Sequence, residues 1–133
     1  MKGRLVTRTG VDIVHIRHFE AVLEENNAKY FSSVYTDYEM QCAAGHRCPA
    51  AFYATRFAAK EAVFKALSIE WEDSMEWSQI EIRSHACGSL EARFFGRIQE
   101  IARENGVCDI SLSVSWDADY AVAFVLITAL SLF

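Results

Sequence analysis

The stretch RFAAKEAVFKAL, residues 56–67, decides how the chain is organised. Eight of its twelve residues are apolar, and the charged residues Lys60, Glu61 and Lys65 lie among them. At about 100° per residue, a helix places Glu61 between Phe57 and Phe64 on an apolar stripe. A carboxylate in such surroundings is unfavourable unless its charge is compensated. The stretch therefore predicts a buried helix with a compensating group opposite Glu61.

Length and composition predict one folded domain that spans residues 1–133. Of these residues 52% are hydrophobic and one is proline, which is typical of a packed domain. The formal net charge of −5 argues against broad nucleic-acid binding. The N-terminus has no apolar signal-peptide core, and the apolar run at residues 120–133 is shorter than the ~20 residues of a membrane helix. We expect a cytoplasmic protein that has no membrane span.

The four cysteines raise the question of a zinc site. In CAAGHRC, residues 42–48, His46 lies between Cys42 and Cys48. Structural zinc sites usually combine two closely spaced ligand pairs, and no second pair is present here. The pattern favours free thiols.

The order of predicted elements indicates an α+β fold. We expect a strand over residues 4–16 and helices over residues 16–26, 36–45 and 49–68, the second of them opened by a capping box of Thr36 and Glu39. The remaining predictions are a strand at residues 78–83, a helix at 90–106, and a hairpin of strands 109–116 and 120–127. The order of strand, helices, strand, helix and hairpin is typical of α+β architecture.

Two carboxylates lie in unusual surroundings. Asp12 interrupts GVDIVHI, residues 10–16, and Glu61 interrupts the apolar stripe. If they met in space they would repel each other, unless they shared a proton or a divalent cation such as Mg²⁺. Two ordinary alternatives remain open: Asp12 accepts backbone amides at a strand end, and Glu61 pairs with Lys65 one helical turn later.

Other residues also allow two interpretations. Arg56, Lys60 and Lys65 either contact phosphate or form a solvated flank of the helix. Trp116 shares a strand face with Leu112 and Val114, and it either packs the core or offers a flat surface to a nucleotide base.

Three motifs in order resemble the holo-acyl-carrier-protein synthases, the small members of the phosphopantetheinyl transferase superfamily. The motifs are GVDIVHI, RFAAKEAVFKAL and SLSVSWDADYAVAFVLI (residues 111–127), and the similarity spans nearly the whole chain. The resemblance implies an α+β fold with an antiparallel sheet and a long central helix, assembled as a homotrimer with active sites between subunits.

The resemblance also implies a reaction and its residues. Such enzymes move 4′-phosphopantetheine from coenzyme A to a serine of an acyl or peptidyl carrier protein and release 3′,5′-ADP. Asp12 and Glu61 match the Mg²⁺ ligands, and Lys65 matches the lysine that contacts the transferred phosphate. Glu61 is then also a candidate base. The same comparison implies a coenzyme A site that includes Arg56, Lys60, Ser113 and Trp116.

Several positions depart from the family pattern. The family has a histidine where Trp116 stands, and the loop at residues 68–77 has four acids and no glycine where relatives are glycine-rich. The helix after the first strand is basic in relatives, to hold an acidic carrier, but carries Glu20, Glu24 and Glu25 here. We therefore expect a conventional acidic carrier to bind less well.

These departures leave a second hypothesis open. A catalytically degenerate relative would bind coenzyme A or a carrier protein without transfer. The retained residues Asp12, Glu61 and Lys65 favour the active enzyme, because a site that no longer bound metal would have little reason to keep two acids in apolar surroundings.

Overall fold

A three-stranded antiparallel sheet forms one side of the molecule in the computed structural model, which describes residues 3–131. Its strands, in spatial order, are β1 (Arg4–His15), β5 (Tyr120–Ser131) and β4 (Val107–Trp116). Every second residue of β5 from Ala121 to Ala129 is buried, because only the inner face of the sheet packs on helices. The predicted hairpin of β4 and β5 is confirmed. Asp117 closes its turn by accepting the backbone N–H groups of Asp119 and Tyr120.

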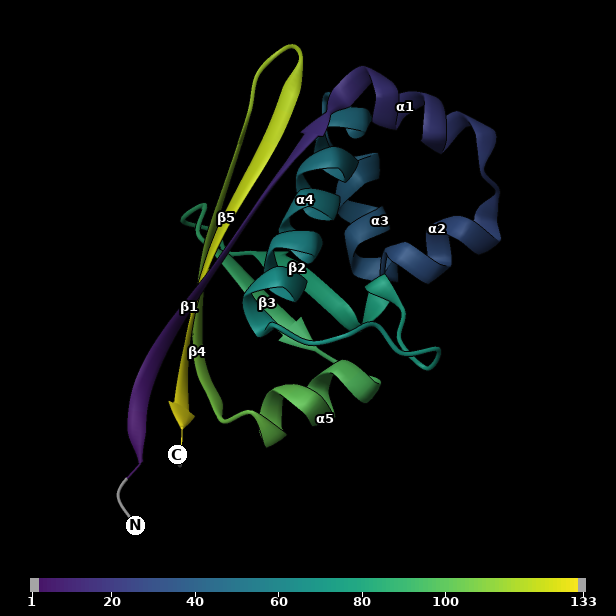
Figure 1. Cartoon of the computed structure of the whole chain (residues 1–133). Coiled ribbons are helices and arrows are strands. Elements are labelled where there is room, and N and C mark those ends of the chain that lie inside the picture. Colours follow the sequence, from purple (N-terminus) through teal and green to yellow (C-terminus); the bar gives the residue numbers. More distant parts are fainter. Residues whose placement is uncertain (1–2, 132–133) are drawn as a thin grey trace.

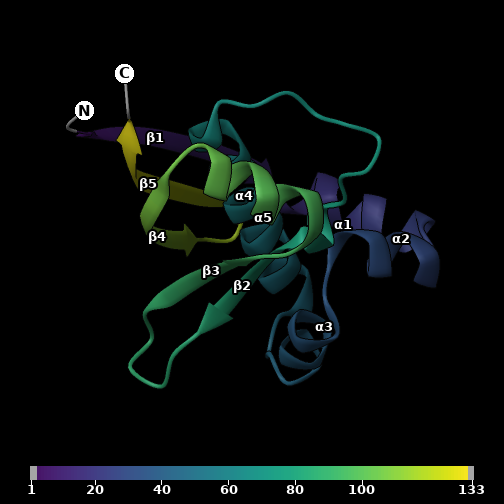
Figure 2. The same ribbon diagram turned by 90° about the horizontal axis from the view of Figure 1, so that it is seen from below.

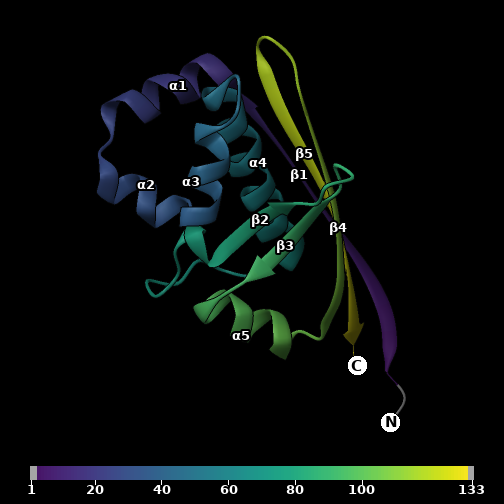
Figure 3. The ribbon, with the colours of Figure 1, turned by 180° about the vertical axis from the view of Figure 1, so that it is seen from behind.

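The long helix α4 (Pro49–Leu67) crosses the inner face of this sheet, and all other helices lie on the same side (Figures 1 and 3). Its approach to the sheet is close, because many of its buried residues are alanines. At Gly10 of β1, a Cβ atom would lie 1.9 Å from the carbonyl oxygen of Ala62. Glycine is therefore required at that position. The helix ends at Ser68, whose φ of 57° is left-handed.

Three short helices arch around the N-terminal half of α4. They are α1 (Ile16–Glu25), α2 (Ala28–Val34) and α3 (Asp37–Ala44). The predicted capping box of α3 is confirmed, since Thr36 and Glu39 bond each other's backbone N–H. Helix α2 was not predicted; Asn27 begins it by accepting the N–H groups of Lys29 and Tyr30.

A second, two-stranded sheet packs against the middle of α4, where Arg56 and Lys60 donate hydrogen bonds to its first strand (Figure 2). It consists of β2 (Ile80–Ser84), preceded by the 3₁₀ turn η1 (Trp77–Gln79), and β3 (Leu90–Phe94), followed by α5 (Gly96–Glu104). The helix predicted over residues 90–106 is wrong in its first part. Leu90, Ala92 and Phe94 alternate toward the core as strand residues do, and the helix begins only at Gly96, where φ is +57°.

The outer face of the three-stranded sheet has no helix over it (Figure 1). Large apolar side chains are exposed there, among them Ile13 at 63% and Phe124 at 47% of their surface. The others on this face are Leu5, Val11, Tyr120, Val122 and Leu130. None of the helices described is long and apolar enough to span a membrane.

Candidate active site

The two carboxylates singled out in the sequence meet between β1 and α4. Strand residues two apart point to the same face, so Asp12 faces α4 together with Gly10. Because Gly10 lies against the backbone of Ala62, Asp12 comes to lie beside the preceding helix residue, Glu61. Burial raises the pKa of Glu61, and the charge and hydrogen bond of the Asp12 side chain raise it further. Two acids from distant parts of the chain thus form one site.

Lys65 supplies a positive charge to this pair, but not in the way that helical spacing suggests. Its Nζ donates to Asp12 Oδ1 at 2.9 Å and to the carbonyl oxygen of Val11 at 3.1 Å. The alternative in which Lys65 pairs with Glu61 is therefore not the one observed, although its charge does lower the pKa of Glu61. The side chain of Lys65 is 53% exposed, which leaves the ammonium accessible to a ligand.

An open pocket of about 330 Å³ adjoins Asp12 and Glu61. The end of β1, the helix α1 and Phe57 form its walls, with Ile13, Val14, Phe19 and Val22 as apolar lining. Two histidines also line it, His15 and His18, whose ring centroids are 4.2 Å apart. The sequence motifs do not single out these histidines as site residues. Their place beside the carboxylates depends on the turn from β1 into α1, which composition does not reveal.

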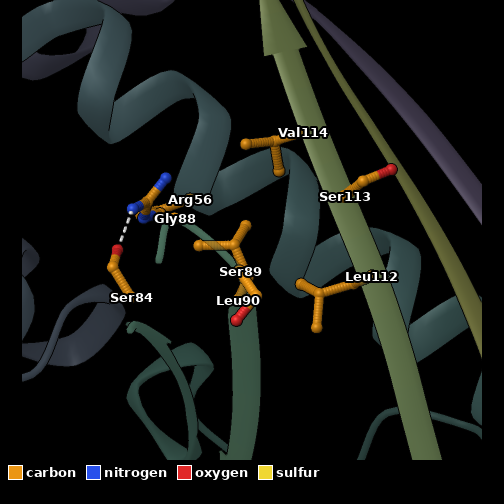
Figure 4. Close-up of a pocket in the computed structure, with 8 residues that line it drawn as sticks. All are labelled: Arg56, Ser84, Gly88, Ser89, Leu90, Leu112, Ser113 and Val114. Atoms are coloured by element: carbon orange, nitrogen blue, oxygen red, sulfur yellow. Dashed lines mark hydrogen bonds between the residues drawn. The ribbon is translucent and has the colours of Figure 1, made fainter. Parts of the chain in front are cut away.

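A second pocket, of about 310 Å³, lies at the other edge of the sheet (Figure 4). Arg56 forms its cationic wall and is only 8% exposed. Its Nη2 donates to Ser84 Oγ at 2.9 Å, and its guanidinium lies 4.3 Å from the centre of the Phe52 ring. The buried Nε has no hydrogen-bond partner among the described residues. A guanidinium that is fixed in the wall of a pocket is suited to attract an anion.

Ser113 and Trp116 occupy different faces of β4. Figure 4 shows the Ser113 side chain directed away from Arg56, on the outer face of the sheet, although the residue lines the pocket. Trp116 follows the register of Leu112 and Val114 and stands at the end of the strand, 38% exposed. Within one protomer, the Ser113 hydroxyl and Arg56 therefore do not converge.

Lys60 contradicts the expectation that it contacts phosphate. Its side chain is fully buried, and Nζ lies 2.8 Å from Glu39 Oε1 while also donating to the carbonyl oxygens of Trp77 and Ile80. Glu39 in turn accepts the N–H of Ile82 at 2.8 Å. The pair fixes α4 to α3 and β2. Helical spacing placed Lys60 on a flank of α4, but it did not show that α3 and β2 cover that flank.

The donor set at Asp12 and Glu61 fits a hard divalent cation. No group of three or more histidine, cysteine or acidic residues able to hold a metal occurs in the described part of the chain. Two carboxylates from the protein, with the remaining positions left to water and substrate oxygens, are the typical ligands of Mg²⁺. The raised pKa of Glu61 agrees with this fit, because a bound cation would relieve the repulsion between the two acids.

The fold and this site define a small α+β protein with a paired-carboxylate centre, and comparison with known proteins identifies its family. The family model of the 4′-phosphopantetheinyl transferase superfamily matches residues 8–125. The holo-[acyl-carrier-protein] synthases of Geobacter metallireducens and Geobacter sp. (strain M21) are 34% and 36% identical to the chain. Each alignment covers 92% of this chain and 98% of the relative. A solved structure described as the Chronobacterium ammoniagenes ACPS-CoA complex is 30% identical, with a TM-score of 0.83, over 93% of this chain and 98% of that one.

The chain therefore belongs to the 4′-phosphopantetheinyl transferase superfamily. Within it, the protein is an enzyme of the holo-acyl-carrier-protein synthase type.

Proposed function

We propose that the enzyme transfers 4′-phosphopantetheine from coenzyme A to a serine of a carrier protein, with Mg²⁺ held by Asp12 and Glu61 and with release of 3′,5′-ADP. The meeting of these two acids beside an open pocket is the observation that carries the proposal. Two acids brought together in half-buried surroundings destabilise a fold, and a fold retains such an arrangement where it binds or reacts.

The residues of the site divide the chemistry between them. Glu61 accepts the proton of the serine hydroxyl as the general base. The serine oxygen then attacks the phosphorus that carries pantetheine, the diphosphate P–O bond breaks, and 3′,5′-ADP leaves. Lys65 leaves Asp12 to bind the phosphoryl oxygens on which charge develops. Bound Mg²⁺ would supply Lewis-acid neutralisation of the diphosphate oxygens.

The Arg56 pocket supports binding of the nucleotide end of coenzyme A. Its guanidinium is a fixed positive charge that lines the pocket, and the pocket is large enough for part of a nucleotide. Arg56 and Glu61 are five residues apart on α4, about 140° around the helix axis. One coenzyme A molecule therefore meets both residues most readily when they come from two different protomers.

A homotrimer built on the outer sheet face meets this requirement. The described side chains on that face of β1 and β5 are apolar or hydroxyl-bearing, apart from His15. A continuous exposed apolar surface of this kind marks an interface rather than a free monomer surface. The sheet edge that carries Asp12 is opposite the edge beside the Arg56 pocket, so a closed ring of protomers brings unlike edges together.

One departure from the family pattern is less severe than the sequence suggested. The acidic loop at residues 68–77 would repel the phosphates of coenzyme A if all its charges were free. However, Arg97 of α5 binds Glu72 through two nitrogens, at 2.9 Å and 3.3 Å. The loop is therefore attached to α5, and one of its four acids is neutralised.

Transfer is tested directly with coenzyme A, Mg²⁺ and a panel of apo carrier proteins, followed by mass spectrometry of each carrier. We expect a phosphopantetheine adduct on at least one carrier and none with Glu61→Gln. Binding of coenzyme A without an adduct on any carrier would contradict the proposal and support the degenerate relative instead. Omission of Mg²⁺ tests the metal separately.

A further inference from the structure

The helix α1 forms one wall of the pocket beside the paired carboxylates, and a histidine caps its first turn. The imidazole of His15 is the N-cap group, and its Nδ1 accepts the backbone N–H of His18 at 3.3 Å. The backbone N–H of Ile16 donates to the carbonyl oxygen of Asp119 at 2.8 Å. The usual N-cap residues are serine, threonine, aspartate and asparagine, whose oxygens accept this bond throughout the neutral range of pH. A histidine cap behaves differently.

The cap exists only while His15 is neutral. A backbone N–H can only donate, so Nδ1 must carry the free electron pair and the proton of the neutral ring is on Nε2. An imidazolium has a proton on both nitrogens and cannot accept. It would also bring a positive charge to the positive end of the helix dipole, in a first turn that has no acid. Histidines gain this proton between about pH 8 and pH 5.

The cations and rings around His15 do not favour its protonated form. The ring centroid of His18 is 4.2 Å away, and positive charges on both rings would repel each other. The exposed Arg17 lies between them in sequence. From β5, Tyr120 packs in a T-shaped arrangement with 5.0 Å between ring centroids, and a phenol brings no counter-charge.

The acids near His15 do not pair with it. Asp12 of β1 and Glu61 of α4 line the same pocket, but Asp12 is paired with Lys65. Asp119 contributes its backbone carbonyl to Ile16. Among the described residues, none of these three acids forms an ion pair with His15. The half-buried imidazole is therefore free to follow the pH of the solution.

The cap controls the part of α1 that nothing else fixes. His18, Phe19 and Val22 line the pocket from this helix. Phe19 is 6% exposed and stacks on Phe57 with 5.3 Å between ring centroids, which anchors the helix to α4. The exposed His18 has no such anchor. Loss of the cap leaves its N–H without an acceptor and loosens the wall next to the carboxylates.

We propose that His15 is a positioning residue of the transfer reaction, whose neutral imidazole holds the α1 wall of the pocket in place and whose protonation releases it. This inference rests on the proposed function, because the wall bounds the site where a carrier serine would meet Asp12 and Glu61. It adds a response to pH that arises in the cap and not in the carboxylates.

Thermal unfolding of His15→Asn and His15→Ala without Mg²⁺ tests the cap itself. Asparagine caps a helix at every pH between 5 and 8, and alanine at none. The wild type should change from the behaviour of the first variant to that of the second as pH falls. We expect its melting temperature to drop by about 4 °C relative to His15→Asn between pH 8 and pH 5, and to approach that of His15→Ala by the same amount.

The transfer assay tests the positioning role, with each protein compared with its own value at pH 8. In the wild type, we expect the KM for the carrier protein to rise about fivefold more toward acid pH than in His15→Asn. The acid loss of kcat, which reports Glu61, should be the same in both. The control is His85→Asn, the same substitution at an exposed histidine that pairs with Glu91, and it should keep the wild-type KM profile.

The two measurements separate the possible results. A melting-temperature difference that does not depend on pH would overturn the inference. So would a pH-dependent difference with parallel KM profiles, because His15 would then be a cap without influence on the reaction. A wild-type KM that falls in acid, when that of His15→Asn does not, would mean that the charge of His15 attracts the carrier. If no carrier is modified at any pH, the proposed function fails and the positioning role with it, whereas the melting temperatures still decide the cap.

Discussion

The surroundings of Glu61 disfavour the ionised form of its carboxyl group. Its pKa is raised in the fold by burial and by Asp12, so the protonated form is the one that the fold stabilises. That stabilisation is present below the unfolded pKa and is lost as pH rises through the folded pKa. Without metal, Glu61→Gln should therefore raise the melting temperature at neutral pH, and the gain in the free energy of unfolding should be at most about 1 kcal/mol after solvent screening. Thermal unfolding with Glu70→Gln as control measures this.

Mg²⁺ should make the wild type more stable than the Glu61→Gln variant. A cation that binds both carboxylates stabilises the folded wild type in proportion to its concentration, whereas Glu61→Gln has lost one ligand. We expect the melting temperature of the wild type to rise with Mg²⁺, and more steeply as pH rises, because metal and proton compete for Glu61. An equal Mg²⁺ effect on the variant would place the metal elsewhere.

Lys60 and Lys65 have the same side chain in opposite environments. Lys60→Met leaves the buried Glu39 without its cation, and we expect a loss of about 3–5 kcal/mol in the free energy of unfolding. Lys65→Met breaks an exposed pair with Asp12 and should change stability by less than about 1 kcal/mol while it abolishes transfer. Urea unfolding together with the transfer assay separates the two roles. Equal stability losses would contradict the assignment.

At this scale the sequence was informative where a residue broke a local pattern. Asp12 in a strand of Val and Ile, and Glu61 in an apolar stripe, are recognisable because each carboxylate interrupts an apolar pattern. Lys60 was misjudged for the opposite reason, since a lysine on a helix flank looks ordinary until another element covers it. Glu39 was recognised as a cap, but its second role depends on contacts with β2 and α4.

The contact between β1 and α4 sets the geometry of the site. Gly10→Ala would place a methyl group against the backbone of Ala62 and Ala66, and backbone atoms cannot turn aside as a side chain can. We expect α4 to shift away from β1, with a loss of about 2–3 kcal/mol in unfolding free energy. Transfer should fall further than stability accounts for, because Glu61 moves relative to Asp12. A variant with normal transfer in its folded fraction would contradict this coupling.

Under the proposed function, we expect the charge of helix α1, which lines the pocket beside Asp12 and Glu61, to affect which carrier proteins bind. Glu24 and Glu25 are exposed in its last turn, where the helix dipole disfavours acids, and neither has an ion-pair partner among the described residues. Replacing both by lysine should raise transfer to an acidic carrier and slightly stabilise the helix. Kinetics at two salt concentrations test this, because an electrostatic gain should shrink at high salt. A gain that does not depend on salt would count against charge as its cause.

Elements could be predicted where their pattern was long and regular. The strand β1, the helix α4 and the hairpin of β4 and β5 follow from apolar spacing and turn residues. The sequence pattern predicts helix for residues 90–94, because the five-residue strand β3 is too short to distinguish a period of two from a helical period. Helix α2 has only seven residues, and its cap Asn27 follows another asparagine in a polar connection.

Assembly is the property for which one chain gives the least direct information, and the clearest sign of it lies in the strand β5. Its outer face carries Val122 and Phe124, opposite Ile13 and Val11 of β1. Phe124→Asp would place a charge in the centre of this face, and we expect monomers in sedimentation equilibrium where the wild type forms trimers. Phe95→Asp is the matched control, because Phe95 is equally exposed but lies outside the face. A wild type that sediments as a monomer would contradict the trimer.

A shared active site makes a stronger prediction than the trimer alone. If Glu61 of one protomer works with Arg56 of its neighbour, Glu61→Gln and Arg56→Lys are each inactive but damage different halves of a site. Mixed oligomers refolded from equal amounts of both contain interfaces at which both halves are intact. In random assembly each interface takes its two protomers independently, so about a quarter of the interfaces have both halves intact. We therefore expect about a quarter of the wild-type transfer rate from the mixture. No recovery would mean that both residues act within one protomer.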